Sequence, residues 1–393
     1  MDLTRYFDHA ATTPVRPEVI AAMAACWADH FGNPSSLHDF GLRAKEALER
    51  ARAVIAGAIG ASPRELIFTG SGTEANNLAV LGGARRMRRL GKGDHVVVSA
   101  VEHPSVREAA RALEAEGFRV TWVPVDAYAR VDPDDVRRAL TPKTVLVSVM
   151  HANNVVGTIQ PIAAIAAAVR RTSALFHCDA AQSFGKIPVN VNALGVDLLT
   201  VNAHKLGGPK GVAALYVRKG VRIDPLVYGG KQERALRPAT QNVPGIVGFA
   251  KAVELALAEQ ETERRRLAAL RQRLIARLAT AIPGFHVNGH PTECLPTHLN
   301  IRIDRIEGQA LMLELDRRGF ATSSGSACSA ANHEPSYVLL AMGQSREAAW
   351  ESLRITLGRT TTEASVDALA DALIAVAHAW QQAANIPFAG GRP

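Results

Sequence analysis

Residues 174–205 read ALFHCDAAQSFGKIPVNVNALGVDLLTVNAHK and contain two short apolar runs, each of which ends in polar residues. The first run leads into Asp179, and the second leads into His204 and Lys205. Short apolar runs bounded in this way are typical of strands that are buried in a parallel sheet. We therefore expect two neighbouring strands of an α/β fold, with a carboxylate at the end of one and a lysine at the end of the other.

The same rhythm continues on both sides of this stretch, between about residues 65 and 217. The other strand-like runs are ELIFTG, HVVVSA, RVTWVPV, TVLVSVMHA and VAALYVR, with amphipathic stretches between them. Ligands of parallel sheets bind at the carboxyl ends of the strands. Those ends carry GSGTEANN, EHPSV, HANN, HCDAAQ and NAHK, so polar residues gather where a site is expected.

The length of the chain predicts two domains, because 393 residues are too many for one compact domain. From about Lys251 to Ala281 the pattern predicts one long helix. After the turn at PGF, strand and helix signals alternate to the end, and we expect the second domain there.

Composition argues against several classes of protein. The net charge of +8 comes with arginines spread over segments such as ERRRLAALRQRLIAR, and 5% of the residues are aromatic, which disfavours nucleic-acid binding. No apolar run reaches membrane-spanning length, and MDLTR leads into YFDHAATTP without an export signal, so we expect a cytoplasmic protein. Cys26, Cys178, Cys294 and Cys328 are far apart, which disfavours a disulfide framework or a zinc ribbon.

Asp179 and Lys205 form the chemically most informative pair. Pyridoxal phosphate needs a carboxylate that keeps its pyridine nitrogen protonated and a lysine that bonds its aldehyde. A salt bridge is the alternative for any single pair of this kind. A metal site at His177, Cys178 and Asp179 is disfavoured, because adjacent strand residues point to opposite faces of the sheet.

The segment TGSGTEANNLA follows the strand-like run ELIF and opens an apolar helix. A glycine-rich helix N-terminus presents free N–H groups that suit a phosphate. A helix capped by Ser71 or Thr73, without any ligand, would have the same sequence.

Cys328 lies in SSGSACSAANH, residues 323–333, where small neighbours offer little to bury a thiol. This composition predicts an accessible, reactive cysteine. Cys178, inside a predicted strand, is expected to be a buried and inert thiol instead.

With these features the chain resembles the cysteine desulfurases of the class V aminotransferase-like family of pyridoxal-phosphate enzymes, of the type with a long SSGSAC cysteine loop. The motifs that carry the resemblance are YFDHAATTPV, GNPSSLH, TGSGTEANNLA, EHPSV, HANNVVGTIQPI, HCDAAQSFGKIPV, AHKLGGPKG, SSGSACSAANHEPSYVL and LRITLGR. They span nearly the whole sequence. The resemblance implies fold-type I, with a mainly parallel central sheet and helices on both faces. The large cofactor-binding domain would be residues 16–255. A smaller α+β domain, residues 1–15 and 256–393, would carry the cysteine loop and the substrate-carboxylate arginine.

The resemblance also implies roles for individual residues. Lys205 is the Schiff-base lysine, Asp179 partners the ring nitrogen, and His103 lies on the ring face. The other implied cofactor contacts are Asn154, Gln182, Gly72, Thr73, Asn202, His204 and, from the neighbouring subunit of a homodimer, Thr240. The implied substrate contacts are Arg354, Asn154 and Asn33.

The implied activity is the conversion of L-cysteine to L-alanine. The Lys205 amine removes the Cα proton, the Cys328 thiolate attacks the substrate sulfur to form a persulfide, and His103 donates or accepts protons. The sulfur then passes to an acceptor or scaffold protein, for iron–sulfur cluster assembly or tRNA thiolation, without direct contact to nucleic acid or membrane. No resident metal is implied, although Cys328 can ligate iron transiently.

Alternatives stay open at this point. A selenocysteine lyase or an aminotransferase of the same superfamily would keep the fold, as would a non-catalytic scaffold or binding protein. His103 could be a turn residue, Asn154 could close an Asx-turn, and Arg354 could form an interdomain salt bridge. The sequence also departs from the family's pattern: Asn202 replaces a serine, Val155 a glutamate, and RPAT, residues 237–240, replaces R-S-G-T.

Overall fold

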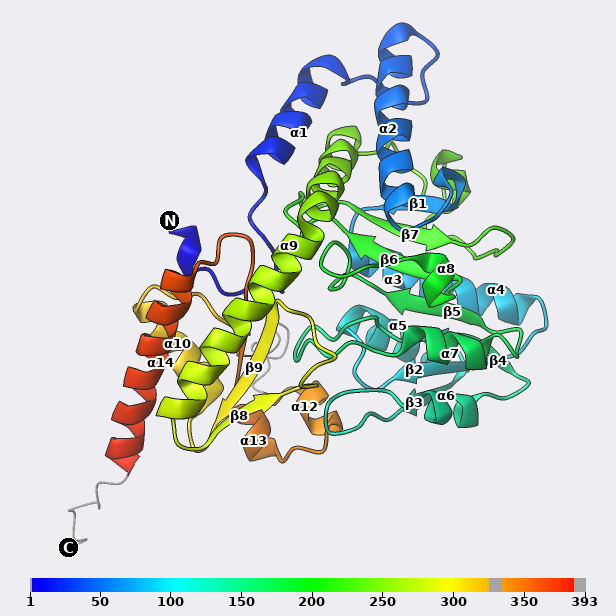
Figure 1. The fold of residues 1–393 in the computed structure, drawn as a ribbon. Helices are drawn as coiled ribbons and strands as arrows, with labels where there is room; N and C mark the ends of the chain where they lie inside the picture. The colour runs from blue at the N-terminus through cyan, green and yellow to red at the C-terminus, as the bar shows by residue number, and fades with distance from the viewer. Residues whose placement is uncertain (1, 325–333, 385–393) are drawn as a thin grey trace, which may run out of the picture.

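A computed structural model describes residues 2–324 and 334–384 (Figure 1). Its larger sheet has the strand order β1-β7-β6-β5-β4-β2-β3 within these residues. The strands are β1 (Leu66–Thr69), β2 (His95–Ser99), β3 (Arg119–Val123), β4 (Thr144–Ser148), β5 (Leu175–Asp179), β6 (Leu198–Asn202) and β7 (Ala213–Val217). Each strand coincides with one of the runs expected from the sequence. The α/β prediction is confirmed.

The sheet is mainly parallel. Strands β2 to β6 pair in parallel with their neighbours, whereas β7 is antiparallel to β6 and β1 is antiparallel to β7. Every residue of β2, β4, β5, β6 and β7 is buried, which is why these strands read as continuous apolar runs. Cys178 is among them and is fully buried, as expected.

Helices cover both faces of this sheet (Figure 1). One face packs with α2 (Asp39–Ala58), α6 (Pro133–Ala139), α7 (Ile162–Val169) and the first part of α9. The other packs with α3 (Gly72–Asn77), the π turn Leu78–Gly82, α4 (Gly83–Arg89) and α5 (Pro104–Ala115). The remaining helices of the described N-terminal part are α1 (Pro17–Asp29) and α8 (Val191–Leu194), with short turns at Leu3–Arg5, Pro63–Glu65 and Gln232–Ala235.

Helix α9 (Val243–Ala281) connects the two halves of the molecule (Figure 1). It begins eight residues earlier than the sequence pattern indicated, because the Asn242 side chain caps it and Pro244 is tolerated in its first turn. Ile246 and Phe249 pack into the core of the large sheet, and Leu270 packs into a second core.

The second core surrounds an antiparallel sheet of order β10-β9-β8. Its strands are β8 (Phe285–Asn288), β9 (His298–Ile303) and β10 (Ser352–Thr356), and its helices are α10 (Gly308–Arg317), α12 (Tyr337–Ala341), α13 (Arg346–Trp350) and α14 (Glu363–Ala384). The start of the chain joins this sheet, since Tyr6 bridges to Ala321 and Asp8 to Thr356. The domain boundary at residues 255 and 256 stays a prediction.

Among the described residues, no helix combines the length and the apolar character that a membrane crossing requires.

Candidate active site

A cavity of ≈ 240 Å³ lies at the carboxyl ends of β4, β5 and β6. We call it the front cavity. Its lining includes many of the residues expected from the sequence, namely Gly72, Thr73, His103, Asn154, Asp179, Gln182, Asn202, His204 and Lys205. The parallel pairing of β5 with β6 puts the ends of these two strands at one edge of the sheet. The structure therefore brings these polar residues together at the edge of the sheet where the sequence predicted them.

Asp179 is fixed at the end of β5. Its Oδ2 accepts a hydrogen bond from Asn76 Nδ2 at 2.8 Å, and its Oδ1 accepts one from the Ala181 N–H at 2.9 Å. The Asn76 amide also donates to Ser105 Oγ, so α3 and α5 both hold the carboxylate in place. Within the described residues no ion pair joins Asp179 to Lys205, and the simple salt-bridge alternative is not what the geometry shows.

Lys205 follows β6 in a turn that the N-terminal segment clamps. Thr13 Oγ1 donates to the His204 carbonyl at 2.8 Å and accepts from the Gly207 N–H at 2.8 Å. Burial lowers the pKa of Lys205 to about 8; the charge of Asp179 opposes this shift and that of Arg354 reinforces it. A lysine with a lowered pKa has a larger share of neutral amine, which can act as nucleophile or base.

His103 is the N-cap residue of α5, and Pro104 occupies the first turn. Its Nδ1 accepts from the Ser105 N–H at 3.2 Å and lies 2.8 Å from Ser105 Oγ. Burial and the Lys205 charge lower the pKa of His103 to about 4, so the imidazole is neutral near pH 7. His103 is thus both the turn residue of the simpler interpretation and a wall of the front cavity.

Two amide side chains of the cavity leave buried oxygens without a partner among the described residues: Asn154 Oδ1 and Asn202 Oδ1. The Asx-turn considered for Asn154 is formed by Asn153 instead, whose Oδ1 accepts from the Val155 and Val156 N–H groups. Buried polar atoms usually have partners, so these two oxygens point to a bound polar group.

The glycine-rich segment forms the start of α3, with Ser71 rather than Thr73 as its cap. Ser71 Oγ accepts from the Glu74 N–H at 3.0 Å. A Cβ on Gly72 would lie 3.4 Å from Asn202 Nδ2. The Asn202 side chain therefore lies against the backbone of this segment, where the family has serine.

Arg354 on β10 lies beside Asn154 but behind the cavity wall. Its Nη2 is 2.8 Å from Asp8 Oδ1, its Nη1 donates to the Asn154 carbonyl at 2.9 Å, and its buried Nε has no partner among the described residues. Arg354 therefore forms a salt bridge, but both partners lie in the predicted small domain, so this is not the interdomain salt bridge considered above. Its role in binding a substrate carboxylate stays a prediction.

Two further expected site residues are not brought to this cavity. Asn33 and Thr240 are exposed and do not line it, and Ala239 next to Thr240 has a left-handed φ of 88°. Cys328 lies outside the described residues.

Several residues of the site were missed by reasoning from sequence. Asn76 and Ser105 hold Asp179, and Thr13 holds the Lys205 turn. Glu102 is fully buried next to His103, its Oε1 accepts from the Met150 N–H, and burial raises the pKa of its carboxyl to about 8. Asn76 could have been found, since it lies one helical turn after Gly72 and Thr73 and so shares their side of the helix.

The described residues contain no group of His, Cys, Asp or Glu side chains placed to hold a metal ion.

Comparison with known proteins supplies independent information. The family model described as aminotransferase class-V matches residues 5–369. A "Cysteine desulfurase IscS" of Methanosarcina thermophila is 47% identical over 362 residues, which cover 92% of this chain and 89% of the relative. One of Dictyoglomus turgidum is 47% identical over 368 residues, covering 94% and 93%.

Solved structures agree with these relatives. A structure titled "NIFS-LIKE PROTEIN" superimposes with a TM-score of 0.89 at 36% identity, covering 94% of this chain and 98% of its own. Another, titled "SspA in complex with cysteine", has a TM-score of 0.80 at 35% identity and covers 91% of this chain and 100% of its own.

Proposed function

We propose, on the premise that this chain belongs to the aminotransferase class-V family and is a cysteine desulfurase, that the front cavity holds pyridoxal 5′-phosphate and admits L-cysteine. The observation that carries this proposal is the placement of Asp179 and Lys205 in one cavity, each held by other groups and not paired with each other.

The residues of the front cavity fit the cofactor. Asp179 would hold the pyridine nitrogen, Lys205 would bond the aldehyde, and the unpartnered oxygens of Asn154 and Asn202 are available to polar groups of the ligand. The cavity lining also includes four other residues implied to contact the cofactor, namely Gly72, Thr73, Gln182 and His204. When bound, the cofactor supplies an electron sink for carbanion chemistry at the amino-acid Cα.

Proton transfers are assigned to two groups of this chain. The Lys205 amine, whose pKa is lowered to about 8, would take the Cα proton of L-cysteine. His103 is neutral near pH 7, so its ring can give a proton from one nitrogen and accept one at the other.

Arg354 would bind the substrate carboxylate, because a planar guanidinium matches a carboxylate with two parallel hydrogen bonds. Asp8 and the Asn154 carbonyl would hold this guanidinium in position until substrate arrives. Ser323 pairs through its backbone with Arg354, at 2.7 and 3.1 Å. Ser323 is thus fixed beside Arg354, and Cys328 follows Ser323 by five residues in the sequence.

The Cys328 thiolate would take the sulfur as a persulfide and pass it to an acceptor protein, with iron–sulfur assembly or tRNA thiolation as its destination. This assignment rests on the resemblance and on the named relatives. A cytoplasmic location belongs to the same proposal.

A homodimer is also proposed. Support comes from exposed large apolar side chains on and near α1 and α2, including Trp27, Phe31 and Leu37, since such patches mark protein interfaces. Thr240 is exposed, which is compatible with a contact to a neighbouring subunit.

The test is incubation of the protein with L-cysteine, followed by quantification of alanine and sulfide and by mass spectrometry of the Cys328 peptide. Cys328→Ala should retain the cofactor and lose sulfide release, while Cys26→Ala, at a buried cysteine of α1, should behave as wild type. Full desulfuration by Cys328→Ala would overturn the persulfide route. Borohydride treatment should fix the cofactor's mass on the Lys205 peptide.

A further inference from the structure

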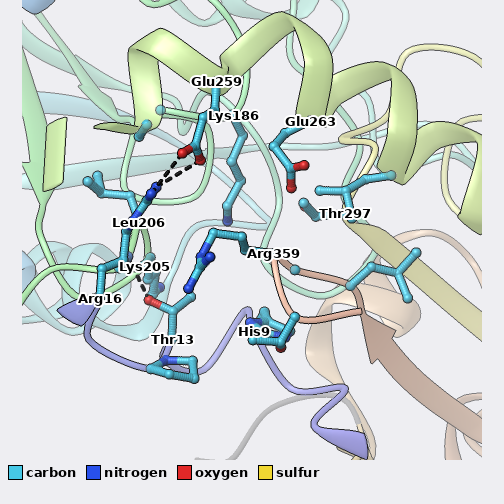
Figure 2. A pocket seen from close by; sticks show the side chains of 18 of the residues that line it. His9, Thr13, Arg16, Lys186, Lys205, Leu206, Glu259, Glu263, Thr297 and Arg359 are labelled. Atoms are coloured by element: carbon cyan, nitrogen blue, oxygen red, sulfur yellow. Dashed lines mark hydrogen bonds and ion pairs between the residues drawn. The ribbon is translucent and has the colours of Figure 1, made fainter. Parts of the chain in front are cut away.

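A second cavity, of ≈ 250 Å³, shares Lys205 with the front cavity (Figure 2). We call it the rear cavity. Its walls come from the N-terminal segment around His9 to Pro17, from residues 256–267 of α9, and from the loop after β10. Neither the sequence motifs nor the desulfurase reaction assign it a role.

The carboxylates in its wall are already neutralised. Glu259 forms two hydrogen bonds with Arg16, at 2.7 and 2.8 Å (Figure 2). Glu263 forms two with Arg266, at 2.7 and 2.8 Å. Both carboxylates are therefore already paired with an arginine, and the charge of Arg359 acts on Glu259 only without an ion pair.

Besides Lys205, two cations that point into the rear cavity form no ion pair with a carboxylate within residues 2–324 and 334–384. Lys186 Nζ donates to Gln182 Oε1 at 3.3 Å, and the Arg359 guanidinium forms no ion pair with any described residue. Figure 2 shows both side chains entering the same cavity. Burial, followed by the charges of Lys205 and Arg354, lowers the pKa of Lys186 to about 7. An anion in this cavity would give the buried Lys186 a counter-charge, and the exposed Arg359 guanidinium can contact the same anion.

Uncharged polar atoms of the same wall also lack partners. The His9 side chain is buried, with 4% of the residue exposed, and its Nε2 has no hydrogen-bond partner among the described residues. The ring packs directly against the Gly358 backbone, where a Cβ would lie 2.4 Å from it. Thr360 Oγ1 is likewise buried and unpartnered. These atoms can contact a ligand that the two cations attract.

Much of the remaining wall is apolar, although Thr13, Gln260, Arg264 and Thr297 also line it. Its apolar lining residues are Leu3, Pro14, Val15, Pro17, Leu206, Ala256, Leu267, Pro296 and Leu357. The volume lies below the range of about 300–1,000 Å³ that is usual for drug-sized ligands. The occupant must therefore be small, with one charged end and a short hydrocarbon body.

We propose that the rear cavity binds a small organic monocarboxylate, held at its charged end by Lys186 and Arg359 and packed along its hydrocarbon part by Leu267 and Leu357. The site is separate from the front cavity, because Lys205 is the only described residue that lines both. It is connected to the front cavity by the hydrogen bond from Lys186 to Gln182 and by Lys205 itself. The proposal does not depend on how the desulfurase reaction proceeds.

The probe is 4-bromobenzoate, whose aryl bromide does not alkylate thiols, titrated into the holoenzyme by isothermal calorimetry. We expect saturable binding to the wild type and an affinity that falls at least about tenfold in Lys186→Met, since a buried charge partner is lost. Lys251→Met is the matched control, because Lys251 lies on α9 outside the cavity and pairs with Glu254; its affinity should equal that of the wild type. Arg354→Lys should also bind as the wild type does.

A crystal soaked with the same probe locates it directly. Anomalous scattering from bromine should appear between Leu267 and Leu357. Equal affinities of wild type and Lys186→Met, or a bromine beside Arg354, would overturn the proposal. If Lys186→Met does not fold, Arg359→Gln replaces it with the same expected loss, because Arg359 is exposed and its removal leaves the core intact.

Discussion

The two cavities that meet at Lys205 are built in opposite ways. In the front cavity the strand ends place the polar groups, and neighbours hold the key ones: Asp179 accepts two hydrogen bonds and Thr13 clamps the lysine turn. In the rear cavity segments far apart in the sequence meet. Among the described residues, Lys186 and Arg359 form no ion pair there, and His9 Nε2 has no hydrogen-bond partner. Catalytic groups are thus held in place where strand ends and their neighbours fix them, as in the front cavity. Charged groups without an ion pair, as in the rear cavity, indicate a site that a ligand completes.

The largest expected effect tests the front cavity at the residue that both cavities share. Lys205→Ala should lower alanine formation from L-cysteine by about 10³-fold or more, because it removes both the cofactor bond and the general base. The measurement is the steady-state rate with added pyridoxal 5′-phosphate. Lys210→Ala, at an exposed lysine in the same loop, is the control and should keep the wild-type rate. A Lys205→Ala rate above a tenth of the wild type would remove Lys205 from the reaction.

The contrast between the cavities also explains what the sequence could predict. The strands and the Asp179–Lys205 pair were predictable, because buried parallel strands leave a local signal and their carboxyl ends share one edge. The rear cavity was not, although His9 lies in YFDHAATTPV and Lys186 in HCDAAQSFGKIPV. No local pattern shows that packing between two sheets leaves a cavity, or which charges stay unpaired around it.

The early start of α9 and the roles of Thr13 and Asn76 were also not predicted, because they too depend on contacts between segments far apart in the sequence. Val243–Lys251 contains a proline and two glycines, so its helical pattern is weak, and tertiary packing of Ile246 and Phe249 decides the outcome. Thr13 and Asn76 act on partners that lie far away in sequence, on the loop after β6 and at the end of β5.

A second prediction concerns the arginine that connects the N-terminal segment to β10. Arg354→Lys should raise the KM for L-cysteine and lower kcat/KM by about 100-fold, because an ammonium cannot form the paired hydrogen bonds of a guanidinium. Asp8→Asn keeps the arginine and removes only its ionic partner, so its loss should be smaller. A larger loss in Asp8→Asn than in Arg354→Lys would mean that the salt bridge, and not substrate binding, is the function of Arg354.

A third prediction tests whether the hydrogen bonds of the front cavity matter. Asn76→Ala removes the Asn76 contact to Asp179 and should lower kcat about tenfold, in line with the ~1.5–3 kcal/mol of a hydrogen bond to a charged group. Asn77→Ala is the comparison, since this half-buried neighbour in α3 donates to the Thr73 and Ser105 carbonyls and makes no hydrogen bond to Asp179. The absorption spectrum of the bound cofactor should shift in Asn76→Ala, which a purely structural defect would not produce. An unchanged spectrum and rate would show that the Ala181 N–H alone suffices to hold Asp179.

The smallest expected effect is on stability, and it probes the rear cavity. Burial, followed by the Lys186 charge, lowers the pKa of His9 from 6.5 to about 4, while a hydrogen bond to the Tyr6 backbone opposes the shift. Between these two values the unfolded chain binds more protons than the folded one, so stability falls as the pH falls. The contribution of His9 to stability is complete above about pH 6.5 and is lost as the pH falls through about 4; about 1 kcal/mol disappears between roughly pH 7 and pH 5.5.

His9→Gln should therefore unfold in urea with a shallower pH dependence of stability than the wild type. Saturating 4-bromobenzoate extends the test. A carboxylate beside Lys186 would offset the charge that disfavours protonated His9, which moves the pKa of His9 part of the way back towards 6.5 and flattens the pH dependence of the wild type. In Lys186→Met that flattening should vanish along with the ligand's affinity. A wild-type profile that is as steep with the ligand as without it would separate His9 from the proposed site and leave the rear cavity as an ordinary packing defect.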